Sequence, residues 1–212
     1  MINKLKPKSE FSRNVLTLMT GATIAQAIPI AISPILTRIY TPEDFGVFAL
    51  YMGIASIVAV IATGRYEMAI MLPKKDSDAV NIVALSVIIS FLVSFISLVI
   101  VFVFNTQITT VLGNQEISNW LYFIPITILL TGIYQSFNYW SNRKKQYRRL
   151  ATSGVIQSSA TSTINLSMGF NGFGSSGLII GQLIGHITAT IILVKQVLKI
   201  DRLFFYQINK YK

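Results

Sequence analysis

The chain contains no cysteine and a single histidine among its 212 residues. Without cysteine it can form neither a disulfide framework nor a thiolate metal site. Acidic residues are also few, with eight Asp and Glu in total, and no two of them are placed for paired acid and base work. No His, Asp and Glu cluster has the spacing of metal ligands, and no glycine-rich phosphate loop is present. We therefore expect no enzyme activity, no bound metal and no cofactor.

Charged residues are scarce as well, at 12% against 52% hydrophobic residues, which is too little polar surface for a soluble domain. The net charge is nevertheless +10. Elsewhere this excess would suggest nucleic acid, but here the basic residues flank long apolar segments. The partners expected from the charge are therefore anionic membrane lipids, and no nucleic acid is expected.

What the chain does have is six long apolar segments. They cover residues 15–37, 45–72, 79–104, 120–140, 151–170 and 178–198. Each is near or above the roughly 20 residues that a helix needs to cross a bilayer, and helices are forced because hydrocarbon offers the backbone no hydrogen-bond partners. We predict an all-α polytopic membrane protein with one transmembrane domain over residues 1–212. Residues 199–212 are predicted to form a basic amphipathic tail along the inner surface.

The basic residues predict the orientation. Of the 18 Lys and Arg residues, all but Arg38 and Arg65 fall in segments that six crossings place on the side of the N-terminus. These residues are Lys4, Lys6, Lys8, Arg13, Lys74, Lys75, Arg143, Lys144, Lys145, Arg148, Arg149, Lys195, Lys199, Arg202, Lys210 and Lys212. Because cytoplasmic loops carry the excess of Lys and Arg, both termini are predicted to be cytoplasmic.

The second segment has a recognisable start. Thr41 is predicted to cap a helix, with Pro42 at its first position and Glu43 and Asp44 near the positive end of its dipole. A helix from Pro42 to Leu72 would be about 46 Å long at about 1.5 Å per residue, well beyond the ~30 Å hydrocarbon core. We therefore expect it to tilt, kink or project from the membrane.

Arg65 and Glu67 are the formal charges well inside an apolar segment. Ionisable groups at membrane depth indicate a functional site. Two residues apart, they lie on nearly opposite faces of a regular helix, so either Gly64 distorts the helix or each has another partner. Ser56, Thr63 and Glu67 share a face that we assign to an internal cavity. The alternative is that both charges extend along the helix to the cytoplasmic headgroups.

Two other segments carry polar residues on one face. In the first, Thr23, Gln26, Ser33 and Thr37 share a face that either lines a cavity or joins helices, and Pro29 and Pro34 interrupt the segment. The fifth segment holds eight Ser or Thr, so it should be shielded from lipid.

In the sixth segment, Gly177, Gly181, Gly185 and Ala189 recur every four residues, which permits close helix contact. His186, next to this face, either relays protons or forms an interhelical hydrogen bond.

Two motifs carry a resemblance to a known family. The run LTRIYTPEDFGVF at residues 36–48 is similar to the first-loop signature of bacterial polysaccharide flippases, the Wzx-like O-antigen and capsule exporters of the MOP superfamily. The run GRYEMAIMLP at 64–73 resembles their second-span motif, and residues 142–149 lie where they carry a basic loop. Such flippases have two six-helix lobes, as multidrug transporters of the related MATE type also do. This chain resembles the N-terminal lobe alone, so we expect an incomplete, truncated or separately encoded half of such a flippase that does not flip substrate by itself.

The resemblance implies a transporter in the bacterial inner membrane. It would flip lipid-linked oligosaccharide, the undecaprenyl-diphosphate-bound repeat unit of polysaccharide or O-antigen biosynthesis, by alternating access coupled to a cation gradient. Arg65, Glu67, Arg38 and Gln26 are the candidate substrate-binding residues, since a guanidinium suits phosphate oxygens. Glu67 and His186 are the candidates for ion or proton coupling.

The resemblance also bears on partners and on competing functions. A second lobe, a second copy of the chain and polysaccharide-assembly proteins are the expected protein partners. Three competing functions stay open at this point: half of a multidrug or ion antiporter, a non-transporting membrane scaffold or remnant, and a membrane-embedded glycosyltransferase. The antiporter would be favoured by acidic residues in the first span, where none is present. The glycosyltransferase is weakened by the missing acidic cluster.

Overall fold

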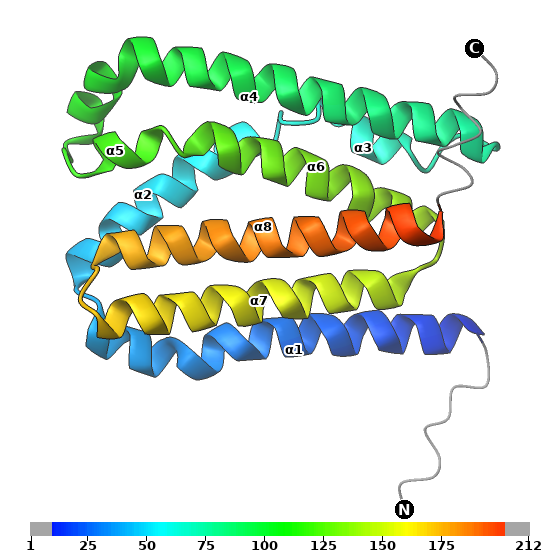
Figure 1. Ribbon diagram of the computed structural model, residues 1–212, viewed down its shortest axis with the longest axis horizontal. Helices are drawn as coiled ribbons and strands as arrows, with labels where there is room; N and C mark the ends of the chain where they lie inside the picture. Colours follow the sequence, from blue (N-terminus) through cyan, green and yellow to red (C-terminus); the bar gives the residue numbers. More distant parts are fainter. Residues whose placement is uncertain (1–9, 202–212) are drawn as a thin grey trace, which may run out of the picture.

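The computed structural model describes residues 10–201, and every regular element in this range is an α-helix (Figure 1). The helices are α1 (Glu10–Ile39), α2 (Pro42–Ala59), α3 (Tyr66–Ala69), α4 (Asp76–Leu112), α5 (Ile117–Leu121), α6 (Ile124–Arg143), α7 (Tyr147–Phe170) and α8 (Ser175–Ile200). The prediction of an all-α protein is confirmed. The proposed tail lies almost entirely outside the described residues.

The long helices run side by side and alternate in direction, so that their connections gather at two ends (Figure 1). One end, which we call the basic end, holds Glu10, Asp201 and the loops at 70–75 and 144–146. The other, the capping end, holds the connections at 40–41, 113–116 and 171–174. The first and last described residues therefore lie at the same end of the bundle.

Five helical segments are long and apolar enough to cross a membrane: Arg13–Ile39, Pro42–Ala59, Asp76–Leu112, Ile117–Arg143 and Ser175–Ile200. The chain is therefore a multi-pass membrane protein. Helix α7 has the length of a span but is more polar, and it packs along both α1 and α8 (Figure 1). Two neighbours thus shield the Ser and Thr side chains of α7, as expected from its composition.

The second apolar segment is interrupted, which agrees with the expected kink and not with a straight helix through the whole segment. Helix α2 ends at Ala59, turns follow, and a single helical turn, α3, covers Tyr66–Ala69. Figure 1 shows this break well inside the bundle, between its two ends. The apolar character of the sequence continues through the break, which is why hydropathy alone did not reveal it.

Helix α4 is longer than predicted. It extends to Leu112, whereas the sequence predicted a loop from residue 105. The polar side chains in this extension find partners within the protein: Asn105 donates to the Ser118 carbonyl oxygen of α5 at 2.9 Å, and Thr109 and Thr110 donate to the carbonyl oxygens four residues earlier at 2.7 and 2.8 Å. Gly113, in the left-handed conformation with φ 66°, then ends the helix.

Small residues let the helices approach closely. A Cβ added to Gly181 would lie 1.8 Å from Oδ1 of Asn165, and one added to Gly185 would lie 1.9 Å from Oγ1 of Thr161. The predicted small-residue face of α8 is thus confirmed as its contact with α7. Helix α4 also packs closely on α6: a Cβ added to Gly132 would lie 2.0 Å from Oγ of Ser90, and the Ser94 hydroxyl donates to the carbonyl oxygen of Pro125 at 2.8 Å. Ser90 and Ser94 belong to a set of four buried serines on α4 that the sequence analysis missed. They are Ser86, Ser90, Ser94 and Ser97.

Candidate functional site

The break between α2 and α3 is built from tight turns. The amides of Ile61, Ala62 and Gly64 donate to carbonyl oxygens three residues earlier, at 3.1, 3.2 and 2.9 Å. Gly64 and Arg65 then both adopt the left-handed conformation, with φ of 58° and 62°. For a residue with a Cβ this conformation costs about 1–2 kcal/mol. Gly64 therefore does distort the helix, as one of the two sequence alternatives required.

The distortion separates the two charges of this segment. Arg65 is exposed, whereas Glu67 is 6% exposed and its carboxylate accepts a hydrogen bond from the hydroxyl of the buried Thr63. Thr63 packs beside α6, because a Cβ on Gly132 would lie 3.5 Å from its methyl carbon. The predicted shared face of Thr63 and Glu67 is therefore confirmed as a direct contact. Ser56, the third predicted member, is exposed.

The break between α2 and α3 exposes irregular backbone between the two ends of the bundle, where the chain is expected to cross the membrane (Figure 1). In hydrocarbon, non-helical backbone is tolerated only where protein covers it or where it lines a water-filled cavity. Gly64, Arg65 and Tyr66 are all exposed in the described chain. The exposed guanidinium of Arg65 and the irregular backbone therefore favour contact of the break with water or another protein, while Val60, Ile61 and Met68 beside it are exposed and apolar.

Helix α1 carries a second exposed polar surface. Thr23, Gln26, Ser33 and Thr37 are all exposed. Helix α1 packs chiefly on α7, where Gly21 lies so close that an added Cβ would be 2.3 Å from Cβ of Ala151. Within residues 10–201 the polar stripe of α1 therefore joins no other helix.

The other predicted site residues do not form one bonded cluster. Arg38 lies exposed in the last turn of α1, at the capping end. Among the described residues, no hydrogen bond or ion pair joins Arg38, Gln26 and Arg65 to one another. No group of three His, Asp or Glu side chains in this part of the chain is placed to hold a metal ion.

His186 lies on α8 against its neighbours. Its Nδ1 is 3.5 Å from Nε2 of Gln157 on α7, and its ring meets that of Tyr134 edge-on at 5.6 Å. This geometry supports the interhelical-contact interpretation of His186. A role in proton coupling stays a prediction.

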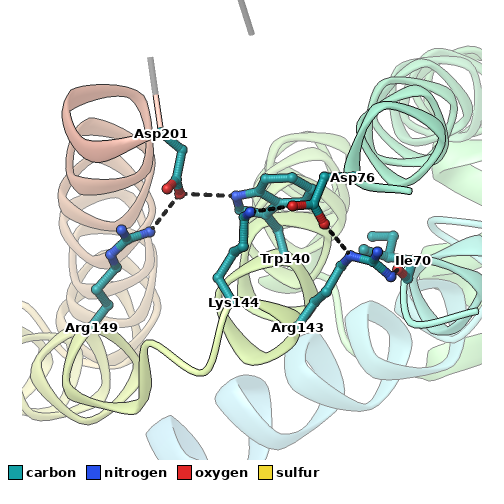
Figure 2. A network of polar contacts seen from close by, with 7 residues as sticks. All are labelled: Ile70, Asp76, Trp140, Arg143, Lys144, Arg149 and Asp201. Atoms are coloured by element: carbon teal, nitrogen blue, oxygen red, sulfur yellow. Dashed lines mark hydrogen bonds and ion pairs between the residues drawn. The ribbon is translucent and has the colours of Figure 1, made fainter. Parts of the chain in front are cut away.

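At the basic end, sequence reasoning missed a buried ion pair that joins three helices. Nη1 of Arg149, at the start of α7, lies 2.9 Å from Oδ2 of Asp201, which follows α8. The same carboxylate oxygen accepts a hydrogen bond of 3.0 Å from Nε1 of Trp140 on α6 (Figure 2). Trp140 is fully buried and Arg149 is 5% exposed. The signal available in the sequence was one acidic residue, Asp201, within a strongly basic flank.

A second ion-pair group lies beside the first. Asp76, the first residue of α4, accepts from Nε of Arg143 at 3.0 Å and from the ammonium of Lys144 (Figure 2). Arg143 also donates to the carbonyl oxygen of Ile70, after α3, at 3.1 Å. Because the two groups share the end of α6, they connect α3, α4, α6, α7 and α8 at the basic end.

At the capping end, Asp44 closes two helices. Its side chain and that of Thr41 cap α2 reciprocally. The Thr41 amide donates to the Asp44 carboxylate at 2.8 Å, and the Asp44 amide donates to the Thr41 hydroxyl at 3.2 Å. The predicted cap at Thr41 is therefore confirmed. The other Asp44 oxygen accepts from the Ser175 amide, at the start of α8, at 2.7 Å. Tyr40, whose phenol pKa is raised by burial and by the Asp44 charge, donates to the Asn165 carbonyl oxygen at 2.6 Å.

Comparison of the sequence with known protein families identifies the family of the chain. Residues 35–207 match the model of a family described as polysaccharide biosynthesis proteins. The match covers most of the chain and includes both the capping motif and the broken second span, so the chain belongs to this family of flippase-like proteins. No curated protein and no solved structure matches the chain.

Proposed function

We propose that this chain forms one lobe of a flippase for lipid-linked oligosaccharide in the bacterial inner membrane. Membership of a polysaccharide biosynthesis family supports the pathway. The observation that carries the mechanism is the broken second span, which exposes Arg65 and irregular backbone at membrane depth. Interrupted helices of this kind form the substrate sites of many transporters.

In this proposal Arg65 binds the diphosphate that links lipid and sugar. A guanidinium is always charged and can offer paired donors to phosphate oxygens, and both effects strengthen in a partly dry cavity. Gln26 and the polar stripe of α1 contact the sugar, and Arg38 meets the diphosphate at the outer mouth. The buried Glu67 carboxyl, held by Thr63, and His186 are the groups proposed for ion coupling. The substrate is moved without chemical conversion.

The same exposed faces imply a protein partner. Arg65, Tyr66, Gln26 and Thr23 would meet lipid in an isolated chain, and a central charge in lipid costs about 3 kcal/mol on insertion scales. A second lobe, or a second copy of this chain, would cover these faces and enclose the cavity between them. Polysaccharide-assembly proteins are further proposed partners. We propose that both termini are cytoplasmic, and the gathering of Lys74, Lys75, Lys144 and Lys145 at the basic end supports this orientation.

Deletion of the gene in its host tests the proposal. We expect surface polysaccharide to fall and the lipid-linked oligosaccharide to accumulate in the inner leaflet, and the wild-type gene should reverse both changes. The Arg65→Lys variant should fail, because a point charge does not replace paired donors. Lys74→Arg, an exposed exchange at the basic end, is the matched control and should restore export.

The outcomes separate the claims. Unchanged surface polysaccharide after deletion would contradict the flippase function as a whole. Normal export by Arg65→Lys would contradict only the proposed contact of Arg65 with the diphosphate, because a side chain that merely reaches the headgroups tolerates lysine.

A further inference from the structure

A groove of about 600 Å³ runs between α1 and α7, in the half of the bundle nearer the basic end. Its floor is the contact of Gly21 with Ala151, where the two backbones come so close that no Cβ fits on Gly21. Leu16 and Ile24 of α1 and Val155 and Ile156 of α7 form its walls. The groove is thus a consequence of the small residues at its floor and the larger ones beside them.

The interior of the groove is suited to hydrocarbon. Of the three threonines that line it, Thr17, Thr20 and Thr152, two turn their hydroxyl groups onto their own helices: Thr17 donates to the carbonyl oxygen of Arg13 at 2.9 Å, and Thr152 donates to that of Arg148 at 2.8 Å. These local bonds satisfy those two hydroxyl groups and leave methyl groups for an occupant. From Arg13 to Ile24 the groove follows α1 for about 17 Å at about 1.5 Å per residue, about half of the ~30 Å hydrocarbon core.

The end of the groove is positively charged. Arg13 lines it and is exposed. Arg148 is also exposed and shares a helical face with Thr152 and Val155, because residues four and seven apart lie above one another on a helix. In the described part of the chain, neither arginine belongs to an ion pair. An apolar groove that ends at two guanidinium groups complements a hydrocarbon chain that ends in a phosphate.

We propose that the groove between α1 and α7 seats the polyprenyl chain of a phosphorylated lipid carrier, with its phosphate bound by Arg13 and Arg148. The proposal rests on the proposed function and adds to it a lipid-chain site apart from the break at Arg65. A single-chain lipid fits better than a two-chain phospholipid, because the groove lies between only two helices that touch along its floor.

Photocrosslinking identifies the occupant. A photoreactive amino acid replaces Ile156 in the full chain, which is reconstituted in phosphatidylglycerol vesicles containing a minor fraction of polyprenyl phosphate. We expect the polyprenyl phosphate to be crosslinked far above its share of the lipid. Crosslinks in proportion to phosphatidylglycerol would overturn the proposal, and so would crosslinks to the chain's own residues 1–9.

Binding measurements then test the contacts. The variant with both Arg13→Gln and Arg148→Gln should bind polyprenyl phosphate roughly tenfold more weakly, the usual effect of losing charge-assisted hydrogen bonds. Neutral polyprenol should bind the variant and the wild-type chain equally. Val155→Trp should fill the groove and abolish binding, whereas Ile191→Trp, on an exposed part of α8, should bind as the wild-type chain does. Unchanged binding by Val155→Trp would overturn the assignment.

These experiments do not depend on transport. If the groove binds polyprenyl phosphate but deletion of the gene leaves polysaccharide export intact, the proposed function is wrong and the lipid site remains. If export depends on the gene but the groove variants bind normally, the site assignment alone is wrong.

Discussion

The carboxylate of Asp44 accepts a hydrogen bond of 2.7 Å from the backbone amide of Ser175, 131 residues further along the chain. With its other oxygen the same side chain caps α2. One residue of the TPED run therefore satisfies orphan amides at the start of two helices and holds them together at the capping end.

Replacing Asp44 by alanine should remove the hydrogen bonds of its carboxylate to the Thr41 and Ser175 amides, while the Thr41 hydroxyl can still accept from the amide of residue 44. We expect the free energy of unfolding to fall by about 2 kcal/mol, since one cap typically contributes about 1 kcal/mol. Thermal unfolding in mild detergent measures the change. Glu43→Ala, an exposed acid next to it on the same helix, is the control and should unfold within about 0.5 kcal/mol of the wild-type chain. Equal effects of the two substitutions would contradict the double cap.

The contact between α4 and α6 should depend on a matched pair of small residues. A Cβ at Gly132 would lie 2.0 Å from Oγ and 2.5 Å from Cβ of Ser90, so Gly132→Ala should destabilise the chain by about 1–3 kcal/mol through overpacking. Adding Ser90→Gly makes room and should restore part of this loss. Gly53→Ala, where an added Cβ meets nothing within 4 Å, should be neutral or stabilising. Failure of Ser90→Gly to rescue would argue against this packing.

The buried pair of Arg149 and Asp201 should be more sensitive to loss of one partner than of both. Asp201→Ala leaves a buried guanidinium uncompensated, which typically costs about 3–5 kcal/mol. The double variant Arg149→Met, Asp201→Ala should be more stable than Asp201→Ala alone. Trp140→Phe removes the hydrogen bond of the indole to Asp201 and the larger ring that Lys144 lies over, and it should cost about 1–3 kcal/mol. Unfolding in denaturant compares these variants with the single variant Arg149→Met. A loss in the double variant equal to the sum of the losses in Arg149→Met and Asp201→Ala would count against coupling.

Arg65→Gly should stabilise the chain while abolishing export. Glycine adopts the left-handed conformation freely, so relief of the strain at φ 62° should add about 1 kcal/mol to the free energy of unfolding. Loss of the guanidinium removes the proposed diphosphate contact. Measuring melting temperature and surface polysaccharide on the same variant separates the two roles. A loss of both would indicate that the Arg65 side chain supports the fold.

Single-cysteine labelling tests the orientation, and the absence of native cysteine makes it clean. A cysteine at Asn171, exposed at the capping end, should react with an impermeant reagent from the periplasm. A cysteine at Lys74 should react only after the inner membrane is permeabilised. Ser175 is unsuitable as a probe because it is 1% exposed. The reverse labelling pattern would invert the proposed topology.

Local chemistry in the sequence predicted much of this fold. Three features were predictable because the residues involved lie three or four positions apart in the sequence. They are the Thr41 cap, the small-residue face at Gly181 and Gly185, and the contact of Thr63 with Glu67. The break before Tyr66 was not predictable from hydropathy, because Ile61 and Ala62 are as apolar as a span requires. The serine face of α4 repeats at intervals of four, four and three residues, so a search for helical faces of small residues would have found it.

The ion pairs at the basic end could not be predicted from local sequence patterns. Asp76 pairs with Arg143 only when α4 packs beside α6. Asp201 pairs with Arg149 only when the end of α8 lies beside the start of α7. In the sequence these acids are indistinguishable from solvated residues in a basic flank. Pairings that depend on tertiary packing of distant segments leave no local pattern.

The position of Asp201 also bears on how the chain is assembled. Its partner Arg149 precedes it by 52 residues, so during synthesis the guanidinium emerges long before the carboxylate. Domains form in the order in which they are made, at roughly 5–20 residues per second. Until α8 has entered the membrane, α7 must keep its arginine at the hydrated surface. Insertion of α8 then brings the counter-charge of Asp201 to Arg149 and joins α8 to α6 and α7.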